Sequence, residues 1–454
     1  MPTAGKGGDG RHWKTNMARF FQPQKKKNLD TKHKAFTVER LDHQGDGVAF
    51  DGKRPVFIAG ALAGEEVVAQ LTEDKRQFAR AKLIKVVTPS AERIEPFCAH
   101  YGVCGGCNLQ HLGHDAQIKA KQNSLSQLMK KFAAADLTQD APVRSEGQGY
   151  RRRARLSVKI SKTGELEMGF RQRSSKEIVT VTHCPVLDKQ LDALLPEVYS
   201  LLDALRGRRV IGHVELVESD AGRVLLVRAI KTLHDEDMAS LKRFADDKAL
   251  ILYLQQGEGN AERMCGDAPH YSLGTLSLSF EPQDFIQVNA DINQKMIAQA
   301  LDWLDLNNDD KVLDLFCGLG NFSLPIAGKA ESVVGVEGVE DMVQRASDNA
   351  THNGLDNVAF YHANLELDAG KTEWGKQRYS KILLDPARAG ALGVMPYVAQ
   401  SRAERIVYVS CNPATLARDS QVLLDKGYKL ARLGMLDMFP HTGHLESMAL
   451  FIKA

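Results

Sequence analysis

The eight residues Val407–Ala414, which read VYVSCNPA, set the architecture of the C-terminal part of this 454-residue chain. The apolar run 405–409 predicts a buried strand that ends near Cys411, because Pro413 cannot continue a β-ladder. Open α/β sheets bind ligands at the carboxyl ends of their strands, and a following helix N-terminus favours a thiolate. Cys411 is therefore a candidate nucleophile; the alternative is a small buried apolar residue.

Strand-like and helix-like segments alternate from about residue 285 onward. The predicted strands are 311–316, 332–337, 358–361, 381–385 and 405–410, followed by an antiparallel pair at 428–433 and 446–452. This alternation is typical of a doubly wound, mostly parallel α/β sheet.

A glycine-rich loop, residues 314–323 (DLFCGLGNFS), follows the first of these strands. Glycines at such a turn let the backbone approach a nucleotide. A dinucleotide fingerprint would require glycine where Ser323 stands. Glu337, at the end of the second strand, is placed to accept hydrogen bonds from ribose hydroxyls. Together with Asn364 and Asp385, which follow the third and fourth strands, it favours S-adenosylmethionine over NAD as the cofactor.

Four cysteines form a three-plus-one pattern, with Cys98, Cys104 and Cys107 close together and Cys184 far downstream. Gly105 and Gly106 allow a tight fold that aims backbone N–H groups at an anionic centre. Structural zinc sites usually combine two close pairs, and four thiolates also suit an iron–sulfur cluster. The spacing predicts a metal site and favours a cluster, with zinc as the alternative.

Short alternating runs between residues 35 and 88, punctuated by glycine and aspartate, predict a small β-barrel of the OB type. The segment resembles a TRAM domain, an RNA-binding barrel. Basic residues also crowd the first 34 positions and the run Arg151–Arg155. Such runs suit a polyanion, because contacts with phosphates release counterions; for the N-terminal stretch, a solvated disordered tail is the alternative.

Composition excludes several classes of protein. No apolar run approaches the roughly 20 residues of a membrane span, and the basic start lacks an apolar signal core. Seven clustered cysteines do not suggest a secreted disulfide framework. We therefore expect a reduced, cytoplasmic protein with no membrane contact and no evident obligate protein partner.

The catalytic part closely resembles the RNA uracil-C5 methyltransferases, which are S-adenosylmethionine-dependent enzymes with a Rossmann-like class I methyltransferase domain. The motifs that carry the resemblance are FIQVN at 285–289, the glycine loop at 314–320, DPAR at 385–388, SCNP at 410–413 and GHLE at 443–446. Combined with the barrel and the four cysteines, the chain resembles the branch of this family that methylates uracil 1939 of 23S rRNA.

The resemblance implies a role for each matching residue. Cys411 would be the nucleophile, Glu446 the base and Asp385 an orienting group, whereas position alone would make Glu446 a surface carboxylate. Cofactor contacts are implied for Gln287, Phe316, Asn321, Glu337, Asn364 and Asp385. A [4Fe-4S] cluster is implied on Cys98, Cys104, Cys107 and Cys184.

The expected architecture is multidomain α/β. It consists of a basic tail at 1–33, expected to be disordered, a TRAM-like barrel at 34–92, a central β-rich domain at 93–110 and 140–284 that carries the cluster site, a helix at 111–139 packed on the catalytic domain, and the methyltransferase domain at 285–454.

Uracil C5 is a poor nucleophile, and addition of the Cys411 thiolate at C6 would activate it; Glu446 would then remove the C5 proton. The target base must leave its stack to reach such a pocket. Three alternatives remain open: the same chemistry on a tRNA or another 23S rRNA uracil, a non-catalytic iron–sulfur RNA-binding module, and a cytosine-C5 enzyme.

Overall fold

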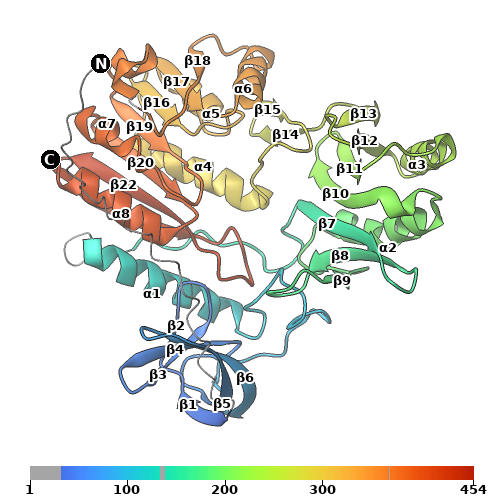
Figure 1. Ribbon diagram of the computed structural model, residues 1–454. Helices are drawn as coiled ribbons and strands as arrows, with labels where there is room; N and C mark the ends of the chain where they lie inside the picture. Colours follow the sequence, from blue (N-terminus) through green and yellow to red (C-terminus); the bar gives the residue numbers. More distant parts are fainter. Residues whose placement is uncertain (1–31, 133–138, 368) are drawn as a thin grey trace, which may run out of the picture.

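The computed structural model describes residues 32–132, 139–367 and 369–454. It contains a small barrel, a central sheet and a larger C-terminal α/β domain (Figure 1). The predicted basic tail, residues 1–33, lies outside the described residues except for its last two. In the described part of the chain, no helix is both long enough and apolar enough to cross a bilayer.

The barrel is a six-stranded sheet with the strand order β1-β5-β6-β4-β3-β2. Its strands are β1 (His33–Thr37), β2 (Arg40–Leu41), β3 (Gly47–Asp51), β4 (Arg54–Ala59), β5 (Glu66–Asp74) and β6 (Ala79–Thr88). Val67, Ala69 and Leu71 alternate along β5 and are buried, as expected for a strand with one face toward a core. The barrel that the sequence predicts is thus present, with an additional two-residue strand, β2.

The central domain is a seven-stranded sheet covered by two helices. Its elements are β7 (Arg153–Ile160), β8 (Leu166–Arg171), β9 (Ile178–Thr180), α2 (Lys189–Ala204), β10 (Ile211–Ser219), β11 (Gly222–Ala229), α3 (Asp235–Asp247), β12 (Leu250–Gln256) and β13 (Glu262–Cys265). The hairpin formed by β14 (His270–Leu273) and β15 (Leu276–Ser279) leads to the catalytic domain.

Two arginines of the basic run Arg151–Arg155, Arg152 and Arg153, serve as structural braces, which corrects the interpretation of these two as RNA-binding residues; Arg155 is exposed. The Arg152 side chain is only 7% exposed; it stacks over Tyr271 and donates from Nε to the carbonyl of Gln287 at 2.7 Å. Arg153 pairs with the buried carboxylate of Glu215 at 3.0 Å. These guanidinium groups therefore satisfy groups at the junction of two domains, where they are not available to phosphates.

The catalytic domain is a seven-stranded sheet with the order β18-β17-β16-β19-β20-β22-β21. The parallel strands are β16 (Lys311–Leu315), β17 (Ser332–Glu337), β18 (Val358–His362), β19 (Lys381–Leu384) and β20 (Arg405–Ser410). β21 (Tyr428–Leu436) and β22 (Glu446–Lys453) complete it as antiparallel strands. The predicted doubly wound sheet and its antiparallel end are confirmed.

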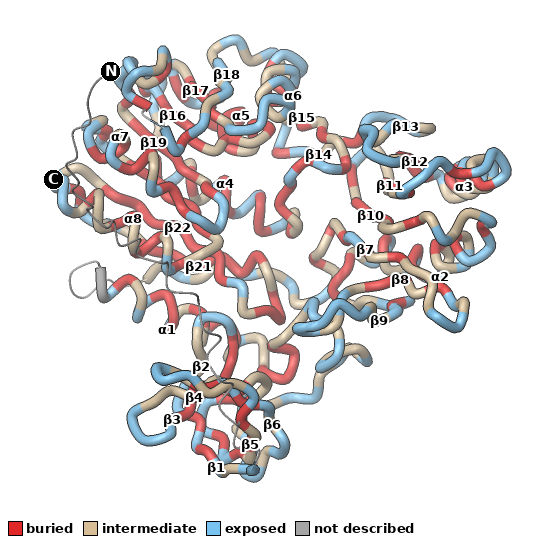
Figure 2. The backbone as a smooth tube through the Cα atoms, in the orientation of Figure 1, coloured by how far each residue is buried: buried red, intermediate tan, exposed pale blue. Residues whose placement is uncertain are grey.

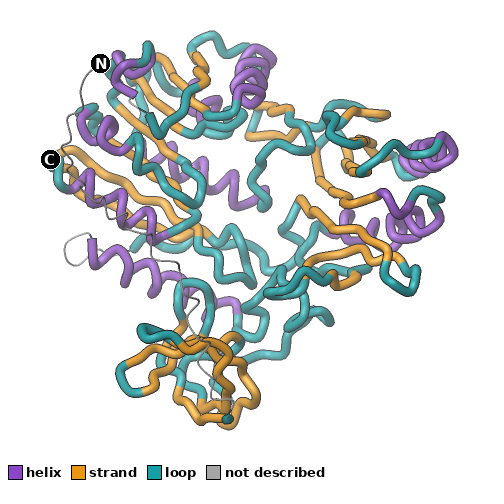
Figure 3. Tube along the Cα trace, in the orientation of Figure 1, coloured by secondary structure: helices purple, strands orange, loops and turns teal. Residues whose placement is uncertain are grey.

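Helices cover both faces of this sheet, so its strands are mostly buried (Figures 2 and 3). They are α4 (Ala290–Leu304), α5 (Ser323–Ala327), α6 (Glu340–His352), α7 (Met395–Gln400) and α8 (Pro413–Leu424). Asn412 caps α8 by accepting from the N–H of Ala414 at 3.1 Å, and Pro413 occupies the first turn. The SCNP motif therefore ends one strand and begins one helix.

A further helix, α1 (His114–Phe132), lies against α8 and β21 and between the catalytic domain and the barrel (Figure 1). Ile118, Leu125 and Met129 are buried in the same apolar cluster as Leu416 and Leu433 of the catalytic domain. This packing attaches the segment that follows the loop of Cys98, Cys104 and Cys107 to the catalytic core.

Candidate active site

Cys411 and Glu446 meet at one end of the catalytic sheet. β20 and β22 pair antiparallel with Ser410 opposite Ser447, so the next residues outward, Cys411 and Glu446, lie near each other, and the charge of Glu446 acts on the thiol. Asp385 follows β19, the neighbouring parallel strand. The structure thus brings together three residues that are far apart in sequence, at the edge where parallel sheets bind ligands.

The glycine loop lies beside them and adopts a conformation that few residues tolerate. Phe316 has a φ of +64° and Gly320 a φ of +95°, and a Cβ at position 320 would lie 2.3 Å from Leu324. Ser323, which departs from the dinucleotide fingerprint, donates from its hydroxyl to the buried carboxylate of Asp314 at 2.5 Å. That hydrogen bond gives the serine a physical reason to be there.

Backbone amides hold the Glu337 side chain in place. One carboxylate oxygen accepts from Gly318 N–H at 3.1 Å, and the other accepts from Gly338 at 2.8 Å and Val339 at 3.1 Å. The oxygen that accepts only from Gly318 keeps one lone-pair position for a further donor such as a ribose hydroxyl. The predicted ribose acceptor is therefore preorganised at the mouth of the glycine loop.

Asn321 is supported by two residues that the motifs do not reveal. Its Oδ1 accepts from Tyr271 Oη and Asn293 Nδ2, both at 3.0 Å, and its Nδ2 donates to Asn293 Oδ1 at 2.9 Å. Tyr271 comes from the β14–β15 hairpin and Asn293 from α4. Asn289 is the N-cap of α4, and Asn293 lies one helical turn further on. This spacing is the only feature of the sequence that points to a polar contact from α4.

Asn364 and Gln287 complete the predicted cofactor residues. The Asn364 side chain is exposed and accepts from the N–H of Glu366 at 3.0 Å in the turn after β18. Gln287 is buried, and its carbonyl is the one that Arg152 holds. Asn364 lies at the carboxyl edge of the catalytic sheet, and Gln287 lies in the segment that leads from the β14–β15 hairpin to α4.

Buried carboxyl groups are concentrated at this edge. Burial raises the pKa of Asp314 to about 7 and that of Asp385 to about 7, although Asp385 retains partial exposure as a whole residue. Burial, with a further contribution from Asp385, raises the pKa of Glu446 well above its ordinary value. One oxygen of Asp314 has no hydrogen-bond partner among the described residues. The site is therefore arranged to gain from a cationic ligand.

The Cys411 thiol is not activated by the helix that follows it, contrary to the sequence expectation. Burial, and then the charges of Glu446 and Asp385, raise its pKa to about 12, while the nearby Arg388 lowers it only in part. Burial is the largest cause because desolvation acts directly on the charged form of the sulfur. In the free protein the thiol therefore stays protonated near neutral pH.

Arg388 and His444 form the wall of the cavity that contains Cys411. Arg388 Nη2 lies 3.1 Å and 3.3 Å from the two ring nitrogens of His444. Burial, with the Arg388 charge, lowers the pKa of His444 to about 4. The ring is neutral at physiological pH, so the positive group beside the cysteine is Arg388; Arg173 also lines the cavity.

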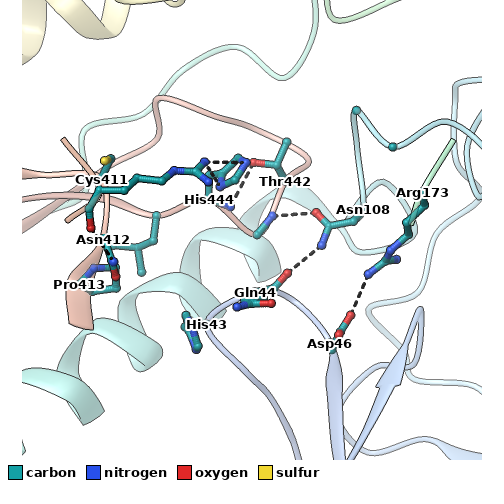
Figure 4. Close-up of a pocket in the computed structure, with 15 residues that line it drawn as sticks. His43, Gln44, Asp46, Asn108, Arg173, Cys411, Asn412, Pro413, Thr442 and His444 are labelled. Carbon is teal, nitrogen blue, oxygen red and sulfur yellow. Dashed lines mark hydrogen bonds and ion pairs between the residues drawn. The ribbon is translucent and has the colours of Figure 1, made fainter. Parts of the chain in front are cut away.

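The cavity measures about 420 Å³ and draws its lining from four parts of the chain (Figure 4). The catalytic domain contributes Cys411 and residues of the β21–β22 loop, 437–445. The cysteine loop, residues 98–113, contributes Asn108, the central domain contributes Arg173, and the barrel contributes the turn at 42–46, which we call the barrel turn. A nucleotide entering this space would lie among all four.

The four predicted metal-ligand cysteines, Cys98, Cys104, Cys107 and Cys184, line a second cavity of about 370 Å³. The N–H of Gly106 points at Cys104 Sγ, 3.4 Å away, as the glycine spacing predicts. Burial, with smaller contributions from the neighbouring thiols, raises the pKa of Cys107 to about 11 and that of Cys184 to about 12. Among the described residues, however, no group of three His, Cys, Asp or Glu side chains is arranged to hold a metal ion. The structure therefore shows a shared cysteine cavity without showing a metal site.

Comparisons with known proteins agree with this geometry. A family model described as tRNA (Uracil-5-)-methyltransferase matches residues 113–454, and the TRAM domain model matches residues 36–84. The chain is 57% identical to the 23S rRNA (uracil(1939)-C(5))-methyltransferase RlmD of Vibrio cholerae serotype O1, across 96% of this chain and 100% of the relative. It is 53% identical to the RlmD of Photobacterium profundum, across 96% of this chain and 97% of the relative.

Among solved structures, the Pyrococcus abyssi tRNA (uracil-54, C5)-methyltransferase in complex with S-adenosyl-L-homocysteine superimposes with a TM-score of 0.72. The similarity covers 92% of this chain and 100% of that one at 22% sequence identity. At that identity the comparison supports the fold alone. Because the superposition covers 92% of this chain, the shared fold includes more than the catalytic domain.

Proposed function

The chain belongs to the RNA uracil-C5 methyltransferase family, and from that premise we propose that it converts a uracil of the 1939 type in 23S rRNA to 5-methyluridine. Membership rests on the family model and on relatives that match almost the whole chain. The observation that carries the chemistry is the placement of Cys411 opposite Glu446, beside the glycine loop. The RNA target rests on the relatives, which are named for methylating uracil 1939 of 23S rRNA. With ribosomal RNA as the substrate, we expect the enzyme to act in the cytoplasm.

Cys411 is the proposed nucleophile. Its thiolate adds to C6 of the uracil and the C5–C6 π electrons move toward C5, so that C5 becomes the nucleophile that methyl transfer requires. After transfer, the C5–H bond breaks, its electrons re-form the C5–C6 double bond, and the thiolate leaves C6. The two-step route replaces one difficult attack by a weakly nucleophilic carbon with easier steps.

Glu446 is the proposed base, and Asp385 the proposed orienting group. The carboxylate of Glu446 takes the C5 proton that must leave before Cys411 can be released; such proton transfers contribute typically about 10²–10⁴-fold. Asp385, on the neighbouring strand, is placed to accept from the N–H edge of the pyrimidine. Both assignments are supported by the convergence of β19, β20 and β22 at one edge.

The residues of the glycine-loop region suit S-adenosylmethionine. When bound, this cofactor supplies an electrophilic methyl group on a sulfonium cation. Glu337 would accept from its ribose hydroxyls, and Gln287, Phe316, Asn321, Asn364 and Asp385 would line the remainder of its site. The fit is supported by the raised pKa values of Asp314, Asp385 and Glu446, because a cation nearby favours their ionised forms.

The same electrostatics would order the events at Cys411. Without ligand, burial raises the pKa of the Cys411 thiol and that of the Glu446 carboxyl, which favours the protonated form of each. A positive charge beside them lowers both pKa values and makes a thiolate and a carboxylate accessible. We therefore propose that Cys411 becomes competent only when the cofactor site is filled, which protects the thiol from reaction in the free enzyme.

We further propose that Cys98, Cys104, Cys107 and Cys184 hold a [4Fe-4S] cluster. Their lining of one cavity supports the proposal. The absence of a single-ion arrangement among the described residues is compatible with it, because four thiolates spread around a cluster lie farther apart than around one zinc at about 2.3 Å. When bound, a cluster supplies cationic iron that offsets the charge of four partly buried thiolates. Its proposed role is to fix the cysteine loop, and iron analysis of anaerobically purified protein tests it; zinc in place of iron contradicts it.

Methyl transfer to defined RNA tests the function. We expect the purified protein to incorporate labelled methyl groups from S-adenosylmethionine into unmodified 23S rRNA, at the single uracil equivalent to position 1939. Transcripts in which that uracil is replaced by cytosine are the control and should stay unlabelled. Labelling of tRNA, or of a different 23S rRNA uracil, would support the same chemistry on another target and would contradict the proposed substrate.

A further inference from the structure

Asn108 stands where the cysteine loop, the barrel and the catalytic domain meet (Figure 4). Its Nδ2 donates to the carbonyl of Gln44 in the barrel turn at 2.7 Å, and its Oδ1 accepts from the N–H of Gly443 in the β21–β22 loop at 2.8 Å. Because both partners are backbone groups of fixed polarity, only one orientation of the amide satisfies both. One side chain therefore joins the barrel turn to the loop that ends at Glu446.

The backbone of the cysteine loop strengthens this junction. The N–H groups of Asn108 and Leu109 both donate to the carbonyl of His441, at 3.0 Å and 2.9 Å. His441 itself has a φ of +64°, a conformation that non-glycine residues hold only when their surroundings fix it. The β21–β22 loop thus depends on contacts from outside its own domain for its shape.

The barrel turn packs directly on the same loop. A Cβ at Gly443 would lie 1.9 Å from the carbonyl oxygen of Gln44, so the two backbones approach as closely as a glycine allows. On its other side the turn is held by Asp46, which pairs with Arg173 of the central domain at 2.9 Å. His43, Gln44 and Asp46 line the cavity that contains Cys411. Contacts that fix the barrel turn therefore also fix one wall of that cavity.

We propose that Asn108 is a positioning residue that clamps the barrel turn onto the β21–β22 loop. The clamp fixes the position of RNA bound to the barrel relative to Cys411 and Glu446. The inference rests on the proposed function and deepens it: the barrel is part of the wall of the active site, in addition to any role as an RNA anchor. Asn108 acts through Gln44 and Gly443 and touches no reacting atom.

Two substitutions separate the two halves of the clamp. Asn108→Asp keeps an oxygen that accepts from Gly443 but places a carboxylate oxygen against the Gln44 carbonyl, so it releases only the barrel turn. Asn108→Ala releases both. Asn123→Ala, on the exposed face of α1, is the matched control for loss of an asparagine amide.

We expect the Asp variant to raise KM for RNA about 3- to 10-fold, the range for one lost hydrogen bond, with kcat and KM for S-adenosylmethionine within about twofold of wild type. The Ala variant should also lower kcat, by about 10- to 100-fold, because the loop that leads to Glu446 loses its side-chain hydrogen bond at Gly443 and keeps only the backbone bonds at His441. Amide hydrogen exchange gives a readout that is independent of catalysis. Exchange in residues 42–46 should accelerate in both variants, and exchange in 437–445 only in the Ala variant.

The outcomes distinguish this inference from the proposed function. If wild type methylates the RNA but both variants keep wild-type KM, kcat and exchange, the clamp is wrong and the function stands. If wild type transfers no methyl group, the function is wrong, and the exchange pattern alone decides the clamp. Equal losses of kcat in both variants, with KM for RNA unchanged, also overturn the clamp.

Should the Ala variant fail to fold, the KM for RNA and the exchange pattern of the Asp variant decide whether the clamp exists. Iron content equal to wild type in the Asp variant is also expected, and its loss would assign the effect to the cysteine loop instead.

Discussion

Two cavities lined by cysteine share residues of the β21–β22 loop, and their cysteines stand on different kinds of structure. Loop residues line most of both cavities, but Cys411 directly follows strand β20 of the catalytic sheet, whereas Cys98, Cys104, Cys107 and Cys184 all lie in loops. Arg388, Thr442 and His444 line both. A regular sheet can hold a nucleophile in place, but a loop needs cross-links of its own.

The neighbours of the thiols differ as well. Burial is the largest cause of a raised pKa for both Cys411 and Cys184, but the next contribution comes from a carboxyl group for Cys411, whereas for Cys184 the like charges that raise it are those of other thiols. Carboxyl groups beside Cys411 suit a cationic cofactor that binds and is released. Thiols beside Cys184 suit a metal centre that stays bound. The comparison teaches that desolvation of a thiol does not by itself distinguish a reactive cysteine from a structural one; the charged neighbours do.

Removal of the nucleophile should give the largest effect. We expect Cys411→Ala to reduce methyl transfer by a factor on the order of 10⁴ or more, because no other group in the cavity can add to C6. Labelled methyl incorporation into 23S rRNA is the measurement, and Cys265→Ala, in the edge strand β13, is the control that should keep its rate. Iron content should be unchanged in both variants. Transfer that survives Cys411→Ala would remove the basis for treating the two cavities as chemically different.

Replacement of the base should stall the reaction at a later step. Glu446→Gln removes the acceptor of the C5 proton and a charge that raises the pKa of Cys411. We expect turnover to fall about 10²- to 10⁴-fold, while a covalent protein–RNA complex accumulates and is visible on a denaturing gel. The double variant Cys411→Ala with Glu446→Gln should form no such complex. A Glu446→Gln enzyme that turns over normally would show that the proton leaves by another route.

Loss of one cysteine from the second cavity should have the opposite pattern. Cys184→Ala is expected to lose bound iron and to lower the midpoint of thermal unfolding by at least about 4 °C, because metal binding and folding are coupled. Methyl transfer per folded molecule should fall less than in Cys411→Ala, since Cys184 contacts no reacting group. Full iron occupancy in Cys184→Ala would exclude this residue as a ligand and would weaken the contrast between the cavities.

The sequence predicts the catalytic sheet well because its signals are local. Its strands are short runs rich in apolar residues, and the ends of β16, β19 and β20 carry the glycine-loop, DPAR and SCNP motifs. Cys411, Asp385 and Glu446 therefore meet as soon as the strand order is known. The barrel is equally visible, since alternation along β5 and the turn glycines report its two faces directly.

Features that depend on the environment were beyond the sequence. The run Arg151–Arg155 has the composition of an RNA-binding stretch, yet Arg152 is buried against Tyr271 because two domains close over it. The Cys411 pKa follows from desolvation that only the folded pocket creates. Asn108 is likewise unremarkable in sequence, since both of its side-chain partners are backbone atoms contributed by distant segments.

The smallest expected effect concerns the carboxyl groups of the first cavity and the pH dependence of stability. Burial raises the pKa of Asp385 to about 7, above the value near 4 that an unfolded aspartate has. Its protonated form therefore contributes stability that is complete below about pH 4 and is lost as the pH rises through about 7. Between pH 5 and pH 7.5, ligand-free wild type should lose more unfolding free energy than Asp385→Asn does, by roughly 2 kcal/mol.

Denaturant unfolding of the two proteins at both pH values measures this difference, and the ligand sharpens it. S-adenosylmethionine is a cation at its sulfur and S-adenosylhomocysteine is not, so only the former should stabilise wild type more at pH 7.5 than at pH 5 through the ionised carboxyl groups. In Asp385→Asn that pH-dependent advantage should shrink. If the two ligands stabilise wild type equally at both pH values, the carboxyl groups of the Cys411 cavity do not respond to a transient positive charge, and the electrostatic contrast with the four-cysteine cavity fails.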